Sequence, residues 1–342
     1  MSELVKLLGG TATAWPLAVR AQTAQPVVGY LAQGSPEGTA DTVQLRAVVV
    51  EYRWAEGRND KFPALLADLI GRQVAVIVAP TTPAVLAAKT ATNTIPIVFF
   101  TAGDPVDLGL VTSLNLPDRN LTGATTLTLE VGPKWLQLLH DTVPSATSLA
   151  LLINPTSPSL AETQARDMQA AAHASGLQLH VLRASTVADF DTVFASIAQL
   201  GAGGLVISSD SFFFGQSKQL ATLAVRHAVP TIFGFREFVT AGGLMSYGGS
   251  LTESFRWVGI YTGQILKGAK PADLPVQRST KIELFINLQT AQALGIESAA
   301  HATYPRRGCY RMNWLDVRFW HKADITTVFQ RCLLLSEKRT SG

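Results

Sequence analysis

Residues 94–109 read Thr-Ile-Pro-Ile-Val-Phe-Phe-Thr-Ala-Gly-Asp-Pro-Val-Asp-Leu-Gly and carry the clearest signal of how the chain folds. The apolar run from Ile97 to Phe100 is short and does not alternate with polar residues, which is typical of a strand covered on both faces. Small and polar residues follow, and we expect a helix to begin near Val106. A buried strand, a polar turn and a helix in this order place a ligand site at the carboxyl end of a parallel strand.

The same succession of strand and helix recurs along the chain. We expect strands at 27–31, 49–53, 74–78, 97–100, 149–153, 177–182, 204–208, 231–233, 244–247 and 282–286. We expect further helices at 62–71, 83–92, 134–142, 160–175, 187–200, 216–227 and 254–267. Strands that alternate with helices in this way predict an α/β fold with doubly wound parallel sheets.

The alternation pauses three times, which predicts two lobes rather than one sheet. The pauses fall near residues 116–126, which are rich in Pro, Asn, Asp, Thr and Gly, and at residues 242–249 and 271–279. We therefore expect an N-terminal lobe formed by residues 26–124 and 248–280. The C-terminal lobe is expected to consist of residues 125–247 and 281–298. Three crossings between two α/β lobes predict a hinge with a cleft beside it.

Length and composition fit a globular protein. The chain has 342 residues, 47% hydrophobic and 15% charged, and its length favours about two domains. The formal net charge of +3 is small, and the basic residues form no stripe, so we expect no nucleic-acid partner. The sequence has no continuous apolar stretch long enough to cross a membrane.

The N-terminal end differs from the body of the chain. Residues 1–25 resemble a secretory leader, because residues 7–17 are apolar or small and Val19-Arg-Ala21 resembles a cleavage site. Only Lys6 precedes the apolar part, so the basic region of this leader is weak. A frayed, mildly apolar terminus is the alternative, and a cleaved leader predicts a periplasmic protein.

The C-terminal end also changes character, from Ala299 onward. Residues 299–342 hold both cysteines, Cys309 and Cys332, and show no clear amphipathic period. We expect a poorly ordered or foreign tail, with a basic and aromatic surface for a partner as the alternative. The body has no cysteine, which excludes a disulfide framework and a cysteine metal site in the core.

Signatures of the common enzyme classes are missing from the sequence. No glycine-rich phosphate loop follows a strand, and there is no Walker loop and no nucleophile elbow. The six histidines are isolated, and no nucleophile has a matched base. We therefore expect no catalysis, no cofactor and no metal.

Polar residues that follow the expected strands form the candidate site. They are Ser35, Thr81, Thr82, Thr101, Asp104, Asn154, Asp210, Glu237 and Tyr247. Each one alone could be a helix cap or a turn former, whereas together they favour a cleft. Threonines and helix N-termini suit a carboxylate, whereas Asp104, Asp210 or Glu237 suits an ammonium. An apolar side chain could pack on Phe212, Phe235 or Phe238, so a small zwitterionic or apolar-bodied ligand is expected.

Several segments of the chain share a pattern with one protein family. They are residues 7–22, Glu51-Tyr-Arg-Trp-Ala-Glu-Gly57, residues 95–106, Arg236-Glu-Phe238, Ala241-Gly-Gly-Leu-Met-Ser-Tyr-Gly248 and residues 260–268. Over about residues 5–297 the chain resembles ABC transporter substrate-binding proteins related to the tryptophan-type, type I periplasmic binding fold. The resemblance implies a hinged, monomeric receptor that delivers an amino-acid-like or aromatic solute to an ABC permease in the inner membrane. It also implies that the candidate residues line the pocket.

The chain departs from the family pattern in three places. Its leader lacks paired arginines, and its tail does not resemble the family's ending. After Pro36, about a dozen residues stand where the family has a full helix, near the minimum for a parallel crossover. A degenerate copy that binds nothing is therefore one alternative.

Two further functions remain open from the sequence. An enzyme on a doubly wound fold would need Asp104 or Glu237 with a strongly perturbed pKa opposite a second titrating group. The ligand-sensing half of a transcription regulator would need an N-terminal helix-turn-helix, for which residues 1–25 are too few and too apolar.

Overall fold

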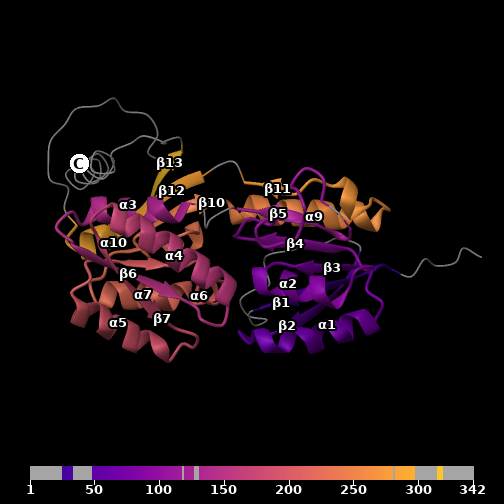
Figure 1. Ribbon diagram of the computed structural model, residues 1–342, viewed down its shortest axis with the longest axis horizontal. Helices are drawn as coiled ribbons and strands as arrows, with labels where there is room; N and C mark the ends of the chain where they lie inside the picture. Colours follow the sequence, from indigo (N-terminus) through magenta and orange to yellow (C-terminus); the bar gives the residue numbers. More distant parts are fainter. Residues whose placement is uncertain are drawn as a thin grey trace, which may run out of the picture.

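The computed structural model describes residues 25–33, 48–117, 119–126, 131–279, 282–296 and 314–318. These residues form two sheets, each with helices on both faces (Figure 1). The expected fold of two doubly wound α/β lobes is confirmed. We call the part that holds the first sheet the first lobe, and the part that holds the second sheet the second lobe.

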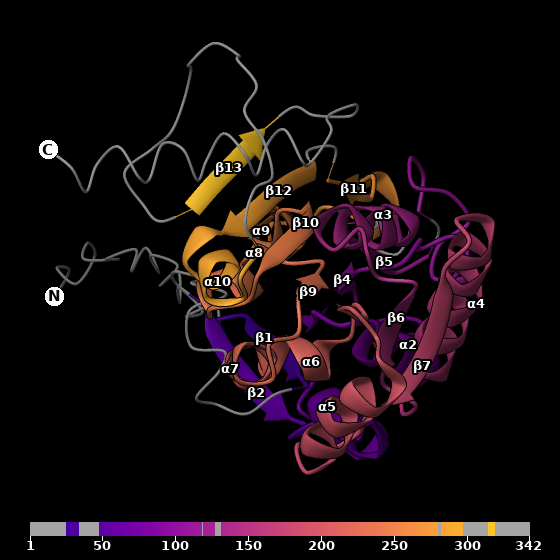
Figure 2. The same ribbon diagram turned by 90° about the vertical axis from the view of Figure 1, so that its left-hand side faces the viewer.

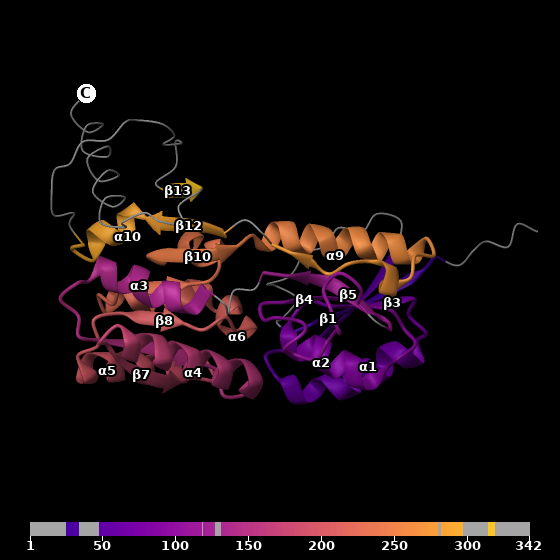
Figure 3. The same cartoon turned by 45° about the horizontal axis from the view of Figure 1, so that its top comes forward.

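The first sheet has the strand order β11-β5-β4-β3-β1-β2, and all its pairs are parallel. Its strands are β1 (Val27–Ala32), β2 (Val49–Trp54), β3 (Val76–Ala79), β4 (Ile97–Thr101), β5 (Leu121–Thr125) and β11 (Gln277–Arg278). One face packs on α1 (Phe62–Gly71) and α2 (Thr82–Ala91) after a short 3-10 turn at Asn59–Lys61. The other face packs on α9 (Leu251–Leu266), which lies over β3, β4 and β5 (Figure 3).

The second sheet has the order β13-β12-β10-β9-β8-β6-β7. Its strands are β6 (Ser148–Ile153), β7 (Gln178–Arg183), β8 (Leu205–Ile207), β9 (Thr231–Phe233), β10 (Met245–Gly249), β12 (Ile282–Asn287) and β13 (Trp314–Arg318). Strands β6 to β10 pair in parallel, whereas β12 and β13 are antiparallel to their neighbours. Figure 2 shows this lobe from its end, with β13 beside β12.

Helices cover both faces of the second sheet. Those packed on one face are α3 (Gly132–Thr142), α4 (Pro158–Ala174) and α10 (Leu288–Ala293). Those packed on the other face are α5 (Asp189–Leu200), α6 (Ser211–Gly215), α7 (Ser217–Arg226) and α8 (Arg236–Thr240). The chain crosses between the lobes after β5, after β10 and after β11, so three connections join them.

Expectations for the chain ends are tested only in part. Residues 1–24 and 34–47, which include the expected leader and the short segment after the first strand, lie outside the described residues. Within the expected tail, Trp314–Arg318 forms β13, and the remainder lies outside the described residues. No helix in the described ranges is long and apolar enough to span a bilayer.

The helix expected near Val106 is wrong. Residues 105–109 form turns, in which the Asp104 carboxylate accepts a hydrogen bond from the Val106 N–H at 2.6 Å. Gly109 then adopts a left-handed conformation with a φ of 63°, which ends the turn. This connection needs no helix of its own because α9 supplies the cover for β4 and β5.

The pause expected near residues 116–126 contains a strand, β5, that the sequence analysis missed. All five residues of β5 are buried, but only Leu121 is a large aliphatic residue, so the apolar signal of a strand is weak. Gly123 lies so close to β4 that an added Cβ would stand 2.1 Å from the Phe99 carbonyl oxygen. The strand is thus held by close backbone packing, which hydrophobic patterns do not report.

Replacing Gly123 with alanine tests this close approach. Because the new methyl group would meet backbone rather than a side chain, β4 and β5 must separate, and we expect Gly123→Ala to lower the free energy of unfolding by about 1–3 kcal/mol or more. Urea denaturation would measure it. The control is Gly71→Ala at the end of α1, where a Cβ meets no atom within 4 Å. If Gly123→Ala lowered the free energy of unfolding by no more than Gly71→Ala does, the close packing of β5 against β4 would be contradicted.

Candidate functional site

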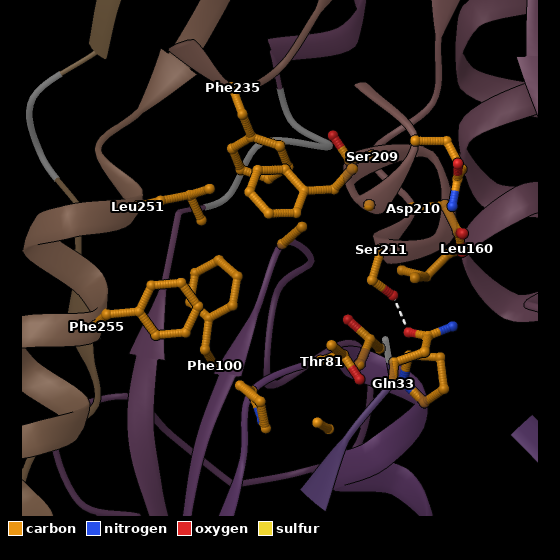
Figure 4. A pocket seen from close by; sticks show the side chains of 18 of the residues that line it. Gln33, Thr81, Phe100, Leu160, Ser209, Asp210, Ser211, Phe235, Leu251 and Phe255 are labelled. Atoms are coloured by element: carbon orange, nitrogen blue, oxygen red, sulfur yellow. Dashed lines mark hydrogen bonds between the residues drawn. The ribbon is translucent and has the colours of Figure 1, made fainter. Parts of the chain in front are cut away.

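A cavity of about 210 Å³ lies between the two lobes, at the carboxyl ends of the parallel strands. Its lining comes from the ends of β1, β3 and β4, from the residues after β8 and β9, and from α2, α4, α6 and α9 (Figure 4). A cavity of about 150 Å³ is large enough to hold benzene. The cavity therefore has room for one aromatic ring with a small polar group.

One side of the cavity is aromatic and aliphatic. The rings of Phe100 on β4 and Phe255 on α9 lie 5.3 Å apart between centroids, and Leu251 stands beside them (Figure 4). Phe214 and Phe235 from the second lobe pack edge to face at 5.6 Å. This side suits an apolar body, because aromatic surfaces bury large apolar groups with defined geometry.

The opposite side of the cavity contains the carboxylate of Asp210, which is 3% exposed. Its Oδ1 accepts hydrogen bonds from the Phe212 N–H and from Asn154 Nδ2, both at 2.9 Å. Its Oδ2 is buried and makes no hydrogen bond within the part of the chain that the structure describes. The carboxylate is therefore half satisfied, since an ionised carboxylate offers acceptor sites on both oxygens.

Burial raises the pKa of Asp210 above its ordinary value of 3.8. The hydrogen bonds from Asn154 and from the start of α6 oppose this shift. The Ser157 hydroxyl opposes it as well, although it does not reach hydrogen-bond geometry. Desolvation dominates because a buried charge without a counter-charge is costly.

The start of α2 faces the cavity, and some of its polar groups are engaged in hydrogen bonds. Thr81 is the N-cap, and its hydroxyl oxygen accepts a hydrogen bond from the Ala84 N–H at 3.3 Å. The hydroxyl groups of Thr82 and Thr101 hydrogen-bond to each other at 2.7 Å. Pro83 supplies no N–H, whereas the Thr81 hydroxyl, which only accepts in its contact with Ala84, keeps its own hydrogen to donate.

Gln33, directly after β1, joins the two lobes at the edge of the cavity. The Ser211 hydroxyl of the second lobe donates to Gln33 Oε1, and Gln33 Nε2 donates to Asn59 Oδ1 at 3.0 Å. Asn59 Nδ2 in turn donates to the Thr156 carbonyl of the second lobe at 3.2 Å. A short network of hydrogen bonds thus bridges the lobes, and Ser211 within it follows Asp210 in the chain.

The structure brings together only part of the site expected from the sequence. Thr81, Thr82 and Asp210 line the cavity. Thr101 and Asn154 do not line it, but they hydrogen-bond to Thr82 and Asp210 from behind. Ser35 lies outside the described residues. Contact of any of these residues with a solute stays a prediction.

The other expected residues lie elsewhere. The Asp104 carboxylate closes the turn after β4 and does not line the cavity. Tyr247 lies half-buried on β10, where its carbonyl accepts a hydrogen bond from Trp135 Nε1 at 2.7 Å and burial raises the pKa of its hydroxyl. Asp104 follows β4, where the turn uses its carboxylate, whereas Tyr247 lies within β10, where its ring packs against the core.

Glu237 on α8 lines a second, smaller cavity of about 50 Å³, together with Ser246 and Glu283. Burial raises the pKa of Glu237, opposed by hydrogen bonding to the backbone and by the Arg236 guanidinium. The two cavities share Leu251 but are otherwise lined by different residues. Among the described residues, no cluster of three His, Cys, Asp or Glu could hold a metal ion.

Sequence reasoning missed most of the apolar lining. Phe235 was anticipated, whereas Phe212 and Phe238 do not line the cavity. The lining residues that were not anticipated as contacts include Tyr30, Phe100, Leu160, Phe214, Leu251 and Phe255. Phe100 is the last residue but one of the buried strand β4, and this position is a usable signal. The residues on α9 have no such signal in the sequence, because only the tertiary structure brings this helix to the cavity.

Two α/β lobes with three connections and a cavity between them are the architecture expected of a two-lobed solute-binding protein. Residues 26–302 match the family described as ABC transporter substrate binding protein, and the chain belongs to this family. Proteins of this family are the binding components of ABC transporters outside the cytoplasm. The partners of the chain are accordingly a small-molecule solute and an ABC permease.

Three relatives show the extent of the similarity. A tyrosine-binding protein of Clostridioides difficile (strain R20291) is 23% identical over 251 residues, which span 73% of this chain and 71% of the relative. The structure of a conserved domain protein from Vibrio cholerae superposes with a TM-score of 0.68 at 23% identity, covering 80% of this chain and 96% of that one. An ABC domain from Streptococcus pneumoniae in complex with L-Trp gives 0.67 at 21% identity, covering 80% and 95%. Similarity to these structures at this level establishes the fold.

The pKa of Asp210 predicts how stability depends on pH. Because the folded state holds the proton more tightly than the unfolded state, the free energy of unfolding falls as the pH rises from the ordinary value of 3.8 through the raised pKa, and then levels off. Asp210→Asn keeps an acceptor for the Phe212 N–H but has no proton to lose. We expect the variant to gain stability relative to the unmodified protein across this range. Urea denaturation between about pH 4 and about pH 8 would measure the free energy of unfolding of both proteins. If the two free energies changed with pH in the same way, the raised pKa of Asp210 would be refuted.

Gln33→Ala tests the bridge between the lobes. The substitution removes the hydrogen bonds to Ser211 and Asn59, and each such bond contributes about 0.5–1.5 kcal/mol. We expect a larger radius of gyration in small-angle X-ray scattering, because a greater share of molecules opens. Gln178→Ala, at an exposed position on β7, serves as the control. An unchanged radius would show that the bridge does not hold the lobes together.

Proposed function

We propose that this protein captures a small solute with an aromatic or apolar body and an amino group in the cavity between its lobes. The observation that carries the proposal is the lining of this cavity, in which Asp210 is the one charged residue among the described lining residues and aromatic rings form the opposite side. A buried carboxylate is stabilised by a cationic partner, and an ammonium group brings three hydrogen-bond donors. The aromatic side would enclose the apolar body.

The relatives support the same class of solute. One is named a tyrosine-binding protein, and another was solved in complex with L-Trp. Both molecules combine an amino group with an aromatic ring, and such a pair of groups complements the two sides of the cavity in this chain. On that basis we propose that the solute of this protein is amino-acid-like or aromatic.

We further propose that the protein works as a monomer in the periplasm, after its leader is removed, and catalyses no reaction. Family membership supports the site of action outside the cytoplasm and the absence of catalysis, because substrate-binding proteins deliver a solute to a permease and leave it chemically unchanged. A copy that no longer binds is the alternative, since about a dozen residues after Pro36 stand where the family has a full helix. The binding experiment below separates these two outcomes.

Thermal and chemical melts of the full chain test solute capture. A solute at about one hundred times its dissociation constant is expected to add about 2.7 kcal/mol to the free energy of unfolding. Aromatic amino acids, aromatic amines and small neutral aromatics are the probes. A chain that none of these probes stabilises would contradict the proposed function and favour the copy that no longer binds.

Phe255→Ala tests the aromatic side of the cavity. The ring lies on α9 against Phe100, and its removal is expected to weaken binding of an aromatic solute by about 1–3 kcal/mol. The matched control is Trp257→Ala, which removes a ring from the same helix outside the cavity. Isothermal titration calorimetry would compare the two, and equal affinities would exclude this side as the solute contact.

A further inference from the structure

We infer that the side-chain amide of Gln216 hydrogen-bonds to a polar substituent on the ring of the solute, so that the cavity selects hydroxylated aromatic amines and amino acids over their plain phenyl counterparts. The inference rests on the proposed function and narrows the class of solute within it. It follows from three features: an amide without partners, the place of this amide along the cavity, and the cost of burying it unpaired.

Gln216 lines the cavity, and only its side chain is available to a solute. Its backbone N–H donates to the Phe212 and Phe213 carbonyls, both at 3.1 Å, and its carbonyl accepts from the Leu220 N–H at 3.0 Å. Gln216 is the N-cap of α7, yet its side chain makes no capping hydrogen bond. The half-buried amide thus keeps two N–H donors and one acceptor oxygen without partners in the described part of the chain.

The other neutral polar side chains of the lining are engaged or enclosed. Four of them already have a partner within the protein: Tyr30, Gln33, Thr82 and Ser211. The Thr81 hydroxyl keeps its hydrogen, but its oxygen accepts from the backbone. Ser209 Oγ has no partner among the described residues, but it is fully buried. Of the neutral lining side chains that the structure describes, Gln216 alone is accessible and has all its polar atoms unpaired.

The short helix α6 runs along the cavity between two polar residues. Asp210 is its N-cap and Gln216 its C-cap, and Ser211 and Phe214 between them also line the cavity. A helix advances about 9 Å along its axis between two such positions. An ammonium group and a ring hydroxyl at the two ends of one phenylethyl body are a comparable length apart. A solute with its ammonium group beside Asp210 therefore presents its ring substituent toward Gln216.

A plain phenyl ring would leave the Gln216 amide unpaired once the solute fills the cavity. Before binding, solvent can hydrogen-bond to this half-buried group, whereas a solute that displaces the solvent must replace those hydrogen bonds. Burying a polar group without a partner is costly. A phenol hydroxyl can donate to the amide oxygen or accept from the amide N–H, whereas a ring hydrogen or a methyl group can do neither.

The experiment compares probes that differ only at the ring, on the unmodified full chain. Isothermal titration calorimetry would measure tyramine against 2-phenylethylamine and L-tyrosine against L-phenylalanine, with 2-(4-methylphenyl)ethylamine as a probe that matches the hydroxyl in size. We expect each hydroxylated probe to bind more tightly than its plain counterpart by about tenfold, because one hydrogen bond is gained and one unpaired amide is avoided. The methyl probe is expected to show none of this preference.

A variant assigns the preference to one residue. Gln216→Leu removes the amide and keeps a side chain of similar size, so we expect it to lower the affinity for tyramine by about tenfold. The affinity for 2-phenylethylamine is expected to stay the same, and binding of this probe also shows that the variant is folded. Gln219→Leu, at an exposed position of α7 outside the cavity, is the matched control.

The outcomes separate the inference from the proposed function. Tyramine that binds no more tightly than 2-phenylethylamine, or than the methyl probe, overturns the inference and leaves solute capture standing. This comparison needs no variant, so it decides the inference even where Gln216→Leu does not fold. A preference for tyramine that survives in Gln216→Leu overturns the role given to this amide. Probes that all fail to bind the unmodified chain overturn the proposed function itself.

Discussion

The half-satisfied carboxylate of Asp210 is the interaction on which the site depends. Asn154 at the end of β6 and Phe212 at the start of α6 bind one oxygen, so the side chain ties together the ends of two neighbouring strands and the helix that follows. Desolvation without a full set of partners makes this group costly to the folded protein. Under the proposed function, a cationic solute beside this carboxylate would lower that cost and so couple solute binding to stability.

The arrangement of the lobes brings this carboxylate next to the contact that joins them. Ser211 follows Asp210 and donates to Gln33 of the first lobe. One continuous core also runs across the gap and includes Phe100 from the first lobe and Phe235 from the second. A solute held between Asp210 and these rings touches both lobes. Under the proposed function, solute binding and lobe closure would therefore involve the same few side chains.

The sequence predicts a residue of the candidate site only where the position of that residue directly after its own strand decides whether it lines the cavity. Thr81, Thr82 and Asp210 follow buried strands, and they line the cavity because the carboxyl ends of parallel strands meet at one edge of a sheet. Asp104 has the same sequence signature, but the turn that follows it uses its carboxylate. Whether a polar atom is left free depends on hydrogen bonds, which the pattern of residues does not specify. Phe255 reaches the cavity from α9, far along the chain.

The sequence by itself determined the alternation of strands and helices, the two lobes and the family resemblance, because these depend on hydrophobic periodicity within short windows. Only the tertiary structure decided that β5 is a strand, since close backbone packing around Gly123 replaces the missing apolar signal. It also decided that α9 covers the first sheet and closes the cavity, and which oxygen of Asp210 lacks a partner. Burial and hydrogen-bond satisfaction are properties of segments brought together from distant parts of the chain, so they exist only once the chain has folded.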